Sequence, residues 1–328
     1  MQSFVGGFPT GVRMPAIVHK IPSKAHHWSP RIPWVPKYNA EEQTKLSWAK
    51  IVESYAVVPK TYKDFFEPLI TAGIEFPYTV LTPTREGFMQ WTTEKLVCDL
   101  GSEICVLEGK GNTFEAQRYP IKGISYVEAG TALLKSSIKI TGVTDKGVPA
   151  SSVFQFNSVT DFLFTPILKR IRNSNGDPKW SAQKSEMEDF DHWARSNFKF
   201  MNYARRSVLT GDRVVHSILQ PEIRKDIVTI LGKTYYKTIS PTHACILTNR
   251  ELIMIREEVN RRGDDRYGGV WDYIPLNKIA NLSLREMNGD LFSLLIELPE
   301  DEQIEFLYQS TAKEEVNMLL HRFRELTA

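Results

Sequence analysis

The chain lacks the cysteines and the charge excess that would place it in several protein classes. Three cysteines occur in 328 residues, Cys98, Cys105 and Cys245, and they are too few and too scattered for a disulfide framework. The sequence therefore favours a reducing compartment. The net charge of +2 is too small to indicate a nucleic-acid-binding surface, so we expect no nucleic-acid partner.

The chain also lacks long apolar runs. None approaches the roughly 18–20 residues needed to span a bilayer, and the first thirty residues have neither the basic start nor the apolar core of a signal peptide. We expect a soluble, cytoplasmic protein, with peripheral attachment to a membrane surface as the alternative.

Sequence motifs for chemistry are missing as well. There is no glycine-rich phosphate loop and no nucleophile elbow. His243 and Cys245 alternate on one predicted strand, but they supply only half of the four ligands of a structural zinc site. The adjacent Asp264 and Asp265 lie among arginines, as solvated charges do. We therefore expect a protein that is not an enzyme and has no metal and no cofactor.

The first 37 residues hold six of the eighteen prolines. Proline at this density removes the backbone donors that a helix or a central strand requires, so an extended arm is predicted. Over residues 1–60 eight Lys and Arg stand against three Asp and Glu, which makes this part basic. Trp28 and Trp34 either pin the arm to the body of the protein or dock into a partner.

Two helices are predicted after the arm. Asn39 and Glu42 form a capping-box pattern ahead of apolar residues at helical spacing, which predicts a helix over about 40–56. Its apolar stripe consists of Trp48, Ile51, Val52 and Tyr55. A second helix is expected from Thr61 and Asp64, with the stripe Tyr62, Phe65, Phe66 and Leu69.

From residue 76 the periodicity changes to that of strands, and short strands at nearly regular spacing indicate a sandwich or a small barrel. The predicted strands cover 78–82, 87–92, 96–99, 103–107, 114–121, 124–128, 131–140 and 152–156. One of the intervening turns is placed at Ala129-Gly130. A helical stripe through Phe164, Ile167 and Ile171 follows, and Pro166 should kink this helix or delay its start.

Residues 173–185 are a loop by composition. Ser185 and Glu188 then open a predicted long helix that runs to about Val208. We expect it to connect two modules, either as a packed connector or as a rigid lever or dimer helix.

The chain contains an internal repeat. At a constant offset of 152 residues, nine positions between Phe154 and Arg172 match positions between Phe306 and Arg324 in residue type. Further upstream we match the run 94–97 with 250–253, and Tyr119-Pro120-Ile121 with Tyr273-Ile274-Pro275-Leu276 at slightly different offsets. Each half therefore reads as a β-meander that ends in one helix.

The second half resembles a known family. Its segments Ile246-Leu247-Thr248-Asn249-Arg250 and Tyr273-Ile274-Pro275-Leu276 are similar to the turn and the middle strand of bacterial pleckstrin-homology-like and GRAM-like domains. Ser207-Val208-Leu209-Thr210-Gly211 is similar to their opening. This resemblance covers 207–328 and is looser over 76–172. It implies two orthogonal antiparallel sheets in a partly open barrel, with the C-terminal helix plugging one end.

We thus predict an α+β, mainly β protein with two tandem pleckstrin-homology-like barrels, each followed by a helix. Its parts are a proline-rich arm and helical segment over 1–75, a first domain over 76–172, a linker and bridging helix over 173–209, and a second domain over 210–328.

The expected function is a non-catalytic module for protein or peptide interaction, acting through an exposed strand edge, or for assembly into a homo-oligomer. The alternative is a peripheral membrane module that binds anionic lipid headgroups. Candidate ligand-binding residues are the basic side chains Lys169, Arg170, Arg172, Arg261, Arg262 and Arg266. Acidic neighbours balance the three in 261–266, and cations near a helix C-terminus also have a structural role for the other three.

Overall fold

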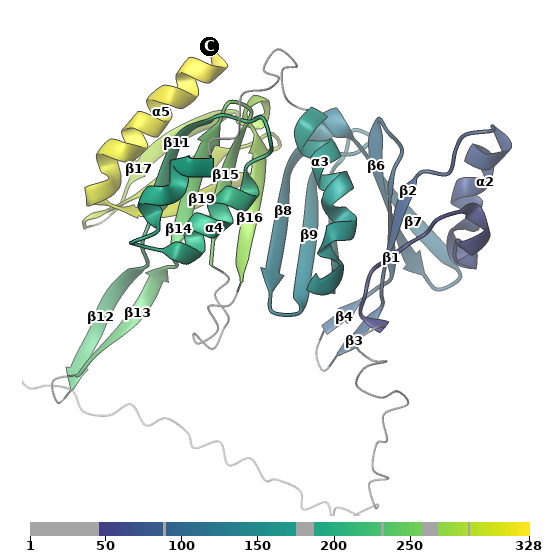
Figure 1. The fold of residues 1–328 in the computed structure, drawn as a ribbon, viewed down its shortest axis with the longest axis horizontal. Helices are drawn as coiled ribbons and strands as arrows, with labels where there is room; N and C mark the ends of the chain where they lie inside the picture. Colours follow the sequence, from purple (N-terminus) through teal and green to yellow (C-terminus); the bar gives the residue numbers. More distant parts are fainter. Residues whose placement is uncertain (1–45, 88–89, 175–186, 231–232, 258–267, 288) are drawn as a thin grey trace, which may run out of the picture. The chain divides into compact units, whose positions relative to one another are not determined.

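The computed structural model describes residues 46–87, 90–174, 187–230, 233–257, 268–287 and 289–328. The protein is mainly β, with antiparallel sheets and a few helices (Figure 1). Within these residues the sheets remain open and form no closed barrel. The α+β, mainly β class is therefore confirmed, whereas closure into barrels is not seen.

The first half contains two consecutive groups of strands and a terminal helix. The first group is β2 (Tyr78–Thr82), β5 (Lys95–Asp99), β6 (Glu103–Lys110) and β7 (Thr113–Pro120). The second group is β8 (Ile124–Ala132), β9 (Lys135–Val143) and β10 (Pro149–Asn157), followed by the 3-10 helix η4 (Ser158–Phe164) and by α3 (Thr165–Ser174).

The second half repeats this order. Its first group is β11 (Val214–Gln220), β14 (His243–Thr248), β15 (Glu251–Arg256) and β16 (Gly269–Pro275). Its second group is β17 (Asn281–Glu286), β18 (Leu291–Glu297) and β19 (Gln303–Gln309), followed by the 3-10 helix η8 (Ser310–Ala312) and by α5 (Lys313–Thr327).

Each half also carries a hairpin inserted after the first strand of its first group. These hairpins are β3 (Arg85–Gly87) with β4 (Gln90–Thr92), and β12 (Ile223–Ile230) with β13 (Lys233–Ser240). Pro221 and Pro241 flank the second hairpin. Because proline has no backbone donor, these residues interrupt the ladder between β11 and β14 and separate the hairpin from the main sheet.

One sheet runs through both halves. Its order is β10-β9-β8-β16-β15-β14-β11, and β8 pairs with β16 from Gly269↔Thr131 to Tyr273↔Val127. At Gly268, which has φ +112°, an added Cβ would lie 1.9 Å from the carbonyl oxygen of Thr131. Only glycine permits this approach of the two strands.

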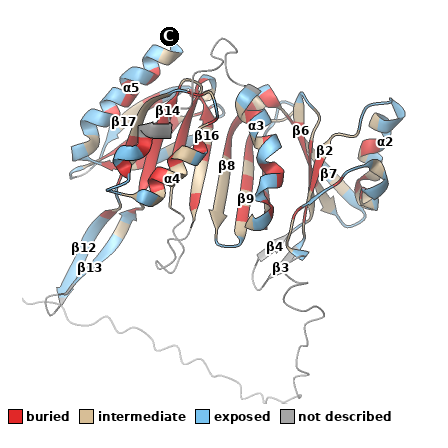
Figure 2. Cartoon of the chain, viewed as in Figure 1, coloured by how far each residue is buried: buried red, intermediate tan, exposed pale blue. Residues whose placement is uncertain are grey.

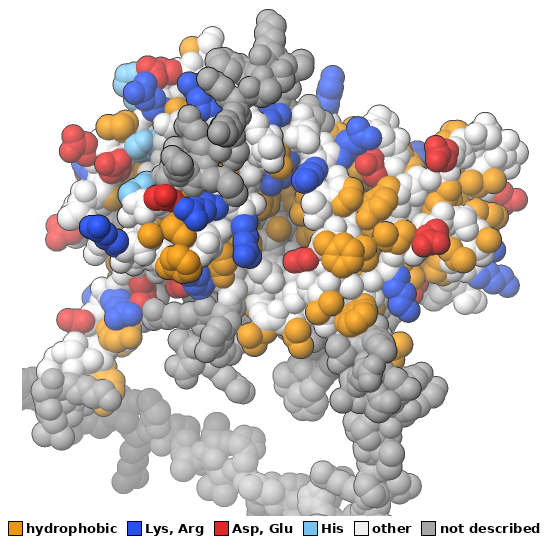
Figure 3. Space-filling view, viewed as in Figure 1, with side chains coloured by type: hydrophobic (Ala, Val, Ile, Leu, Met, Phe, Trp, Pro, Cys, Tyr) orange, Lys and Arg blue, Asp and Glu red, His pale blue; other side chains and the backbone are white. Residues whose placement is uncertain are grey.

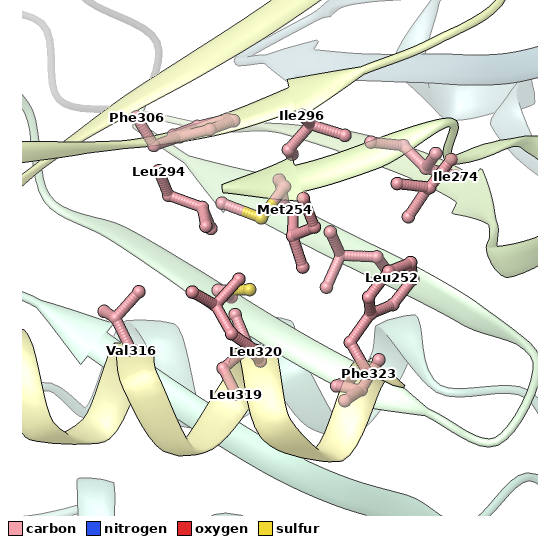
Figure 4. Packing of buried hydrophobic residues seen from close by; sticks show 14 of the residues in the cluster. Leu252, Met254, Ile274, Leu294, Ile296, Phe306, Val316, Leu319, Leu320 and Phe323 are labelled. Atoms are coloured by element: carbon pink, nitrogen blue, oxygen red, sulfur yellow. The ribbon is translucent and has the colours of Figure 1, made fainter. Parts of the chain in front are cut away.

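Each half has its own core (Figure 2). In the second half, Val316, Leu319, Leu320 and Phe323 on α5 pack onto residues such as Leu252 and Leu294 (Figure 4). A stripe at this spacing occupies one face of a helix, so α5 covers the open side between the two groups of strands. The α3 residues Ile167 and Ile171 have the corresponding place in the first half.

Helical segments cover the outer faces of the first strand groups. The 3-10 helix η2 (Lys60–Tyr62) and α2 (Lys63–Thr71) pack over β5 and β6, as the stripe of the second predicted helix indicates. The 3-10 helix η6 (Met187–Trp193) and α4 (Phe198–Ser207) pack over β14 and β15. With both faces covered, β14 is buried along its whole length, which explains its continuous apolar sequence.

The predicted helix over 40–56 is wrong in its described C-terminal part. Lys50 and Ile51 form the short strand β1 (Lys50–Ile51), which pairs with β2, and a 3-10 turn, η1 (Tyr55–Val57), follows. Pairing with the open edge of β2 satisfies backbone groups that a helix would have satisfied internally, so tertiary context overrides the apolar spacing. Asn39 and Glu42 lie outside the described residues.

Two further local predictions are corrected. The single helix over 185–208 is divided at Asn197, whose side chain accepts a hydrogen bond from the Phe200 N–H at 3.1 Å and thereby caps α4. The turn expected at Ala129-Gly130 lies instead at Leu133-Leu134, and Gly130 is a strand residue between Val270 and Ser137. Glycine is present here because the neighbouring strands approach closely, and it does not form a turn. By contrast, α3 does begin beside Pro166, as expected.

The hydrogen bonds at the corners of the two halves define equivalent positions. Ile121 N–H donates to the Ser102 carbonyl at 3.0 Å, and Leu276 N–H donates to the Arg250 carbonyl at 2.9 Å. The segment 121–132 of the first half therefore corresponds to 276–287. The match of 94–97 with 250–253 is wrong by one strand, because 95–97 lie in β5 and 251–253 in β15.

Candidate functional site

The three basic residues expected on α3 lie in different environments. Lys169 is exposed. The Arg170 side chain is 53% exposed, and its Nε lies 3.3 Å from Oδ2 of Asp99. The Arg172 side chain is only 8% exposed. On the face that Figure 3 shows, Lys and Arg are interspersed with Asp and Glu. A ligand can reach Lys169 and Arg170, but Arg172 is removed from the candidate site.

Arg172 joins the two halves. Its Nε donates to Oε2 of Glu251 at 3.1 Å, and its Nη2 donates to Oε1 of Glu251 and to the carbonyl oxygen of Ser207. Its guanidinium also lies 3.8 Å from the ring centroid of Tyr273. Arginine suits such a place because its planar group can pair bidentately with a carboxylate while it stacks on an aromatic face.

Burial dominates the electrostatics around Arg172. It raises the pKa of Glu251, and Arg172 and Arg250 oppose this rise. Burial likewise raises the pKa of Asp212, which Arg250 opposes through a hydrogen bond from its Nε to Asp212 Oδ1 at 2.5 Å. For Arg172 burial acts to lower the pKa, but Glu251 and Tyr273 raise it above its ordinary value. The arginines thus favour the charged form of two carboxyl groups whose burial favours the neutral form.

The other three candidates, Arg261, Arg262 and Arg266, lie outside the described residues. Asp264 and Asp265 do too.

A cleft of about 270 Å³ opens beside the β8–β16 pairing. Arg256 bridges two carboxylates there, with Nη1 donating to Asp272 and Nη2 donating to Glu128 at 2.7 Å. Burial raises the pKa of Asp272 from 3.8 to about 7, an effect that Arg256 reduces and Glu128 increases. Nearby, the Tyr126 hydroxyl donates to Oε1 of Glu302 at 2.8 Å. The sequence analysis missed this cluster, whose members lie on β8, β15 and β16 and, for Glu302, between β18 and β19.

His243 and the three cysteines are buried. Burial lowers the pKa of His243 to about 4 and raises that of Cys245, so both side chains are neutral near pH 7. Cys98 and Cys105 are also buried thiols. In the part of the chain that the structure describes, no group of His, Cys, Asp and Glu could hold a metal ion. No helix there is long and apolar enough to cross a membrane.

Among the described residues, the sheet edges formed by β17 and by β7 pair with no further strand. β17 is the edge of its three-stranded sheet, and β7 is the edge of its five-stranded sheet. Met287 N–H donates to the Leu291 carbonyl, so by the alternation of an antiparallel ladder the N–H and C=O groups of Leu282, Leu284 and Glu286 point to the open edge. Such an edge is a template for another strand.

The β12–β13 ribbon is a feature that the sequence analysis missed. Lys225 pairs with Lys237 and Val228 with Tyr235, so these four side chains and that of Ile239 share one face of the ribbon. Its carboxylate, Asp226, pairs with Tyr236 on the other face. The alternation of Lys, aromatic and aliphatic residues over 233–239 was the signal that could have revealed this face.

Replacing Arg172 by methionine should destabilise the protein by about 3–5 kcal/mol, because Glu251 would be left as a buried, unpaired charge. Urea unfolding at pH 7 measures the loss. The matched control on the same helix is Arg170→Met, which removes an exposed ion pair and should change the unfolding free energy by less than about 1 kcal/mol. Adding Glu251→Gln to Arg172→Met should recover part of the loss. Equal effects of the two single substitutions would contradict this account.

Asp272 should make stability depend on pH between about 4 and 7. Its folded pKa of about 7 lies above the ordinary 3.8, so the folded state retains a proton that the unfolded state releases, and stability falls as pH rises through this window. At about 1.4 kcal/mol per pKa unit, Asp272→Asn should gain up to a few kcal/mol relative to the wild type by pH 8. Unfolding curves over pH 4–8 test this, with the exposed Asp145→Asn as control. A constant difference between Asp272→Asn and wild type would contradict it.

No family model matches the chain, and no curated protein has a significantly similar sequence.

Proposed function

We propose that the chain consists of two tandem pleckstrin-homology-like units and works as a non-catalytic assembly module. Two features support this architecture: a four-stranded and a three-stranded group in each half, and a C-terminal helix that packs between them. In this proposal β17 adds an extended strand to its open edge, and the strand comes from a second copy of the chain.

The observation that carries the proposal is the pairing of β8 with β16. By the repeat, β17 of the second half is the counterpart of β8 in the first half. In the same way, β7 of the first half is the counterpart of β16 in the second half. The chain thus already forms one such contact internally, between β8 and β16. In the proposed assembly, β17 of one copy and β7 of the next pair in the same way. Such a head-to-tail contact extends into a row or closes into a ring.

The internal register specifies the contact between copies. Val270 pairs with Gly130, and the corner equivalence assigns Glu115 to the place of Val270 and Arg285 to the place of Gly130. Arg285 of one copy therefore lies opposite Glu115 of the next. Directly opposed charges of opposite sign stabilise a strand pair by roughly 0.2–1 kcal/mol.

The edge of β7 can accept this strand. Since Ile121 N–H bonds to the Ser102 carbonyl, the outward backbone groups of β7 are those of Phe114, Ala116 and Arg118. Of these, the Arg118 carbonyl already accepts a hydrogen bond from Asp145 N–H at 2.9 Å. Fewer ladder bonds are left than β8 and β16 offer, so the contact between copies should be weaker than the internal one and depend on concentration.

The contact also includes the C-terminal helix. Arg324 on α5 is the repeat counterpart of Arg172, and Glu103 at the start of β6 is the counterpart of Glu251. Arg118, at a distance of 3.5 Å, already pairs with Glu103, and it stands where Tyr273 stacks in the second half. In the contact between copies, Glu103 is therefore shared by Arg118 of its own copy and Arg324 of the other copy. This ion pair contributes less to the contact than the Arg172–Glu251 pair contributes inside the chain.

The test uses two proline variants of the full chain. Leu284→Pro removes an outward N–H from β17, and Ala116→Pro removes one from β7, at edge positions where a strand tolerates proline. The wild type should increase in mass with concentration in analytical ultracentrifugation, and each variant alone should remain a monomer. An equimolar mixture should form a dimer and nothing larger, because one intact β17 and one intact β7 remain.

Leu284→Ala is the matched control, since it loses the side chain and keeps the N–H. It should assemble like the wild type, within about threefold in the concentration required. A further pair keeps the backbone intact: Arg285→Glu should weaken assembly, and adding Glu115→Arg should restore it. A wild type that stays monomeric at all concentrations, or variants that all assemble, would overturn the proposal.

A further inference from the structure

The turn between β8 and β9 exposes apolar side chains at its tip. Leu133 is 70% exposed and Leu134 is 60% exposed, and Leu133 has φ 52°. Hairpin turns with positive φ favour Asn and Gly, and leucine is strained in this conformation. The tip therefore keeps two large apolar side chains in water, one of them on a backbone that does not suit it.

The start of η4 adds to the same tip. Ser158 donates from its Oγ to the carbonyl of Leu133 at 2.8 Å and from its N–H to the carbonyl of Leu134 at 3.2 Å. Its neighbour Val159 is 50% exposed, and Phe162, one 3-10 turn later, is 63% exposed. We name Leu133, Leu134, Val159 and Phe162 the apolar tip.

The corresponding turn of the second half is one residue longer and lacks the apolar side chains: Ala132 pairs with Lys135, whereas Met287 bonds to Leu291. Ser310 N–H donates to the Asp290 carbonyl at 2.8 Å, which corresponds to the bond from Ser158 to Leu134. Gly289, with φ 81°, then stands at the place of Leu133. At the offset of 152 residues, Thr311 and Glu314 replace Val159 and Phe162. The second half thus forms its turn and its helix start without large apolar residues at these places, and it has glycine with positive φ where the first half has Leu133.

We infer that the apolar tip inserts into the interface of a lipid bilayer that carries anionic headgroups. The tip is a protruding turn, and side chains on a protrusion can enter a lipid surface without a preformed pocket. Lys135 follows Leu134 directly, and Lys50 lies beside Ala49, whose N–H donates to Thr160 Oγ1 of η4 at 3.1 Å. The exposed Asp161 of η4 offsets part of this positive charge. Lysines around an apolar contact add attraction to anionic lipids.

The β12–β13 ribbon supports a lipid surface as the occupant. It projects from the main sheet in Figure 1. Its face with Lys225, Lys237, Val228 and Tyr235 combines positive charge with apolar and aromatic groups that suit the headgroup region.

The experiment is sedimentation of the full-length protein with vesicles of phosphatidylcholine, with or without phosphatidylserine, at low and high salt. The decisive variant gives the apolar tip the residues of the second half: Leu133→Gly, Leu134→Asp, Val159→Thr and Phe162→Glu. All four replaced side chains are exposed, so the variant should fold, and its unfolding midpoint should stay close to that of the wild type. Its binding to vesicles with phosphatidylserine should fall at least about tenfold.

The control is Lys169→Glu, which changes the exposed charge on α3 and leaves the apolar tip intact. It should bind within about twofold of the wild type. A wild type that binds neither kind of vesicle would overturn the inference. Equal binding by wild type and tip variant would overturn it too, and loss of binding only in Lys169→Glu would move the lipid contact to α3. Phe162→Trp gives a direct readout, because its fluorescence should shift to shorter wavelength with vesicles.

Discussion

The pairing of β8 with β16 is the interaction on which the rest of the structure depends. It turns the three strands of one half and the four of the other into a single sheet. Without this pairing, β8 and β16 would each be an edge strand with a row of unpaired backbone groups. Such an edge can pair with other chains and cause aggregation. The contact requires close strands, which is why glycine is present at 268. Burial at the contact also explains the perturbed Asp272, because a carboxylate beside the joined strands loses water and keeps only Arg256 as a strong partner.

Arg172 shows how one repeated residue acquires two roles. In the first half it is buried against Glu251 of the second, whereas its repeat counterpart Arg324 is exposed on α5. The two arginines have the same place on their helices and differ only in what lies beside them. A buried ion pair gives little net stability over an apolar pair, but removing one partner is severe. Arg172 therefore specifies how the halves fit together more than it stabilises them.

Much of the fold follows from local patterns in the sequence. The apolar run of β14, the apolar stripe of α5 and the internal repeat can each be recognised without knowledge of distant contacts. Where the analysis failed, a distant segment decides the structure. Lys50 and Ile51 form a strand and no helix because they pair with the edge of β2. Gly130 was predicted to be in a turn because the sequence does not show that β9 and β16 lie on either side of it. The same limit applied to the site: Arg172 seemed an accessible cation, since its partner is 79 residues away.

Assembly and membrane contact, as proposed, reinforce each other. A tip of four apolar side chains provides a reversible contact, comparable in kind to the marginal binding of a single acyl chain. Every copy added through β17 and β7 brings another tip. Once one copy is bound, the others meet the surface at a high effective concentration, and the avidity can exceed that of a single tip by orders of magnitude, provided that the geometry lets several tips reach the same surface. On this argument, the weakness of the contact between copies is useful, because the surface itself would then favour the assembled state.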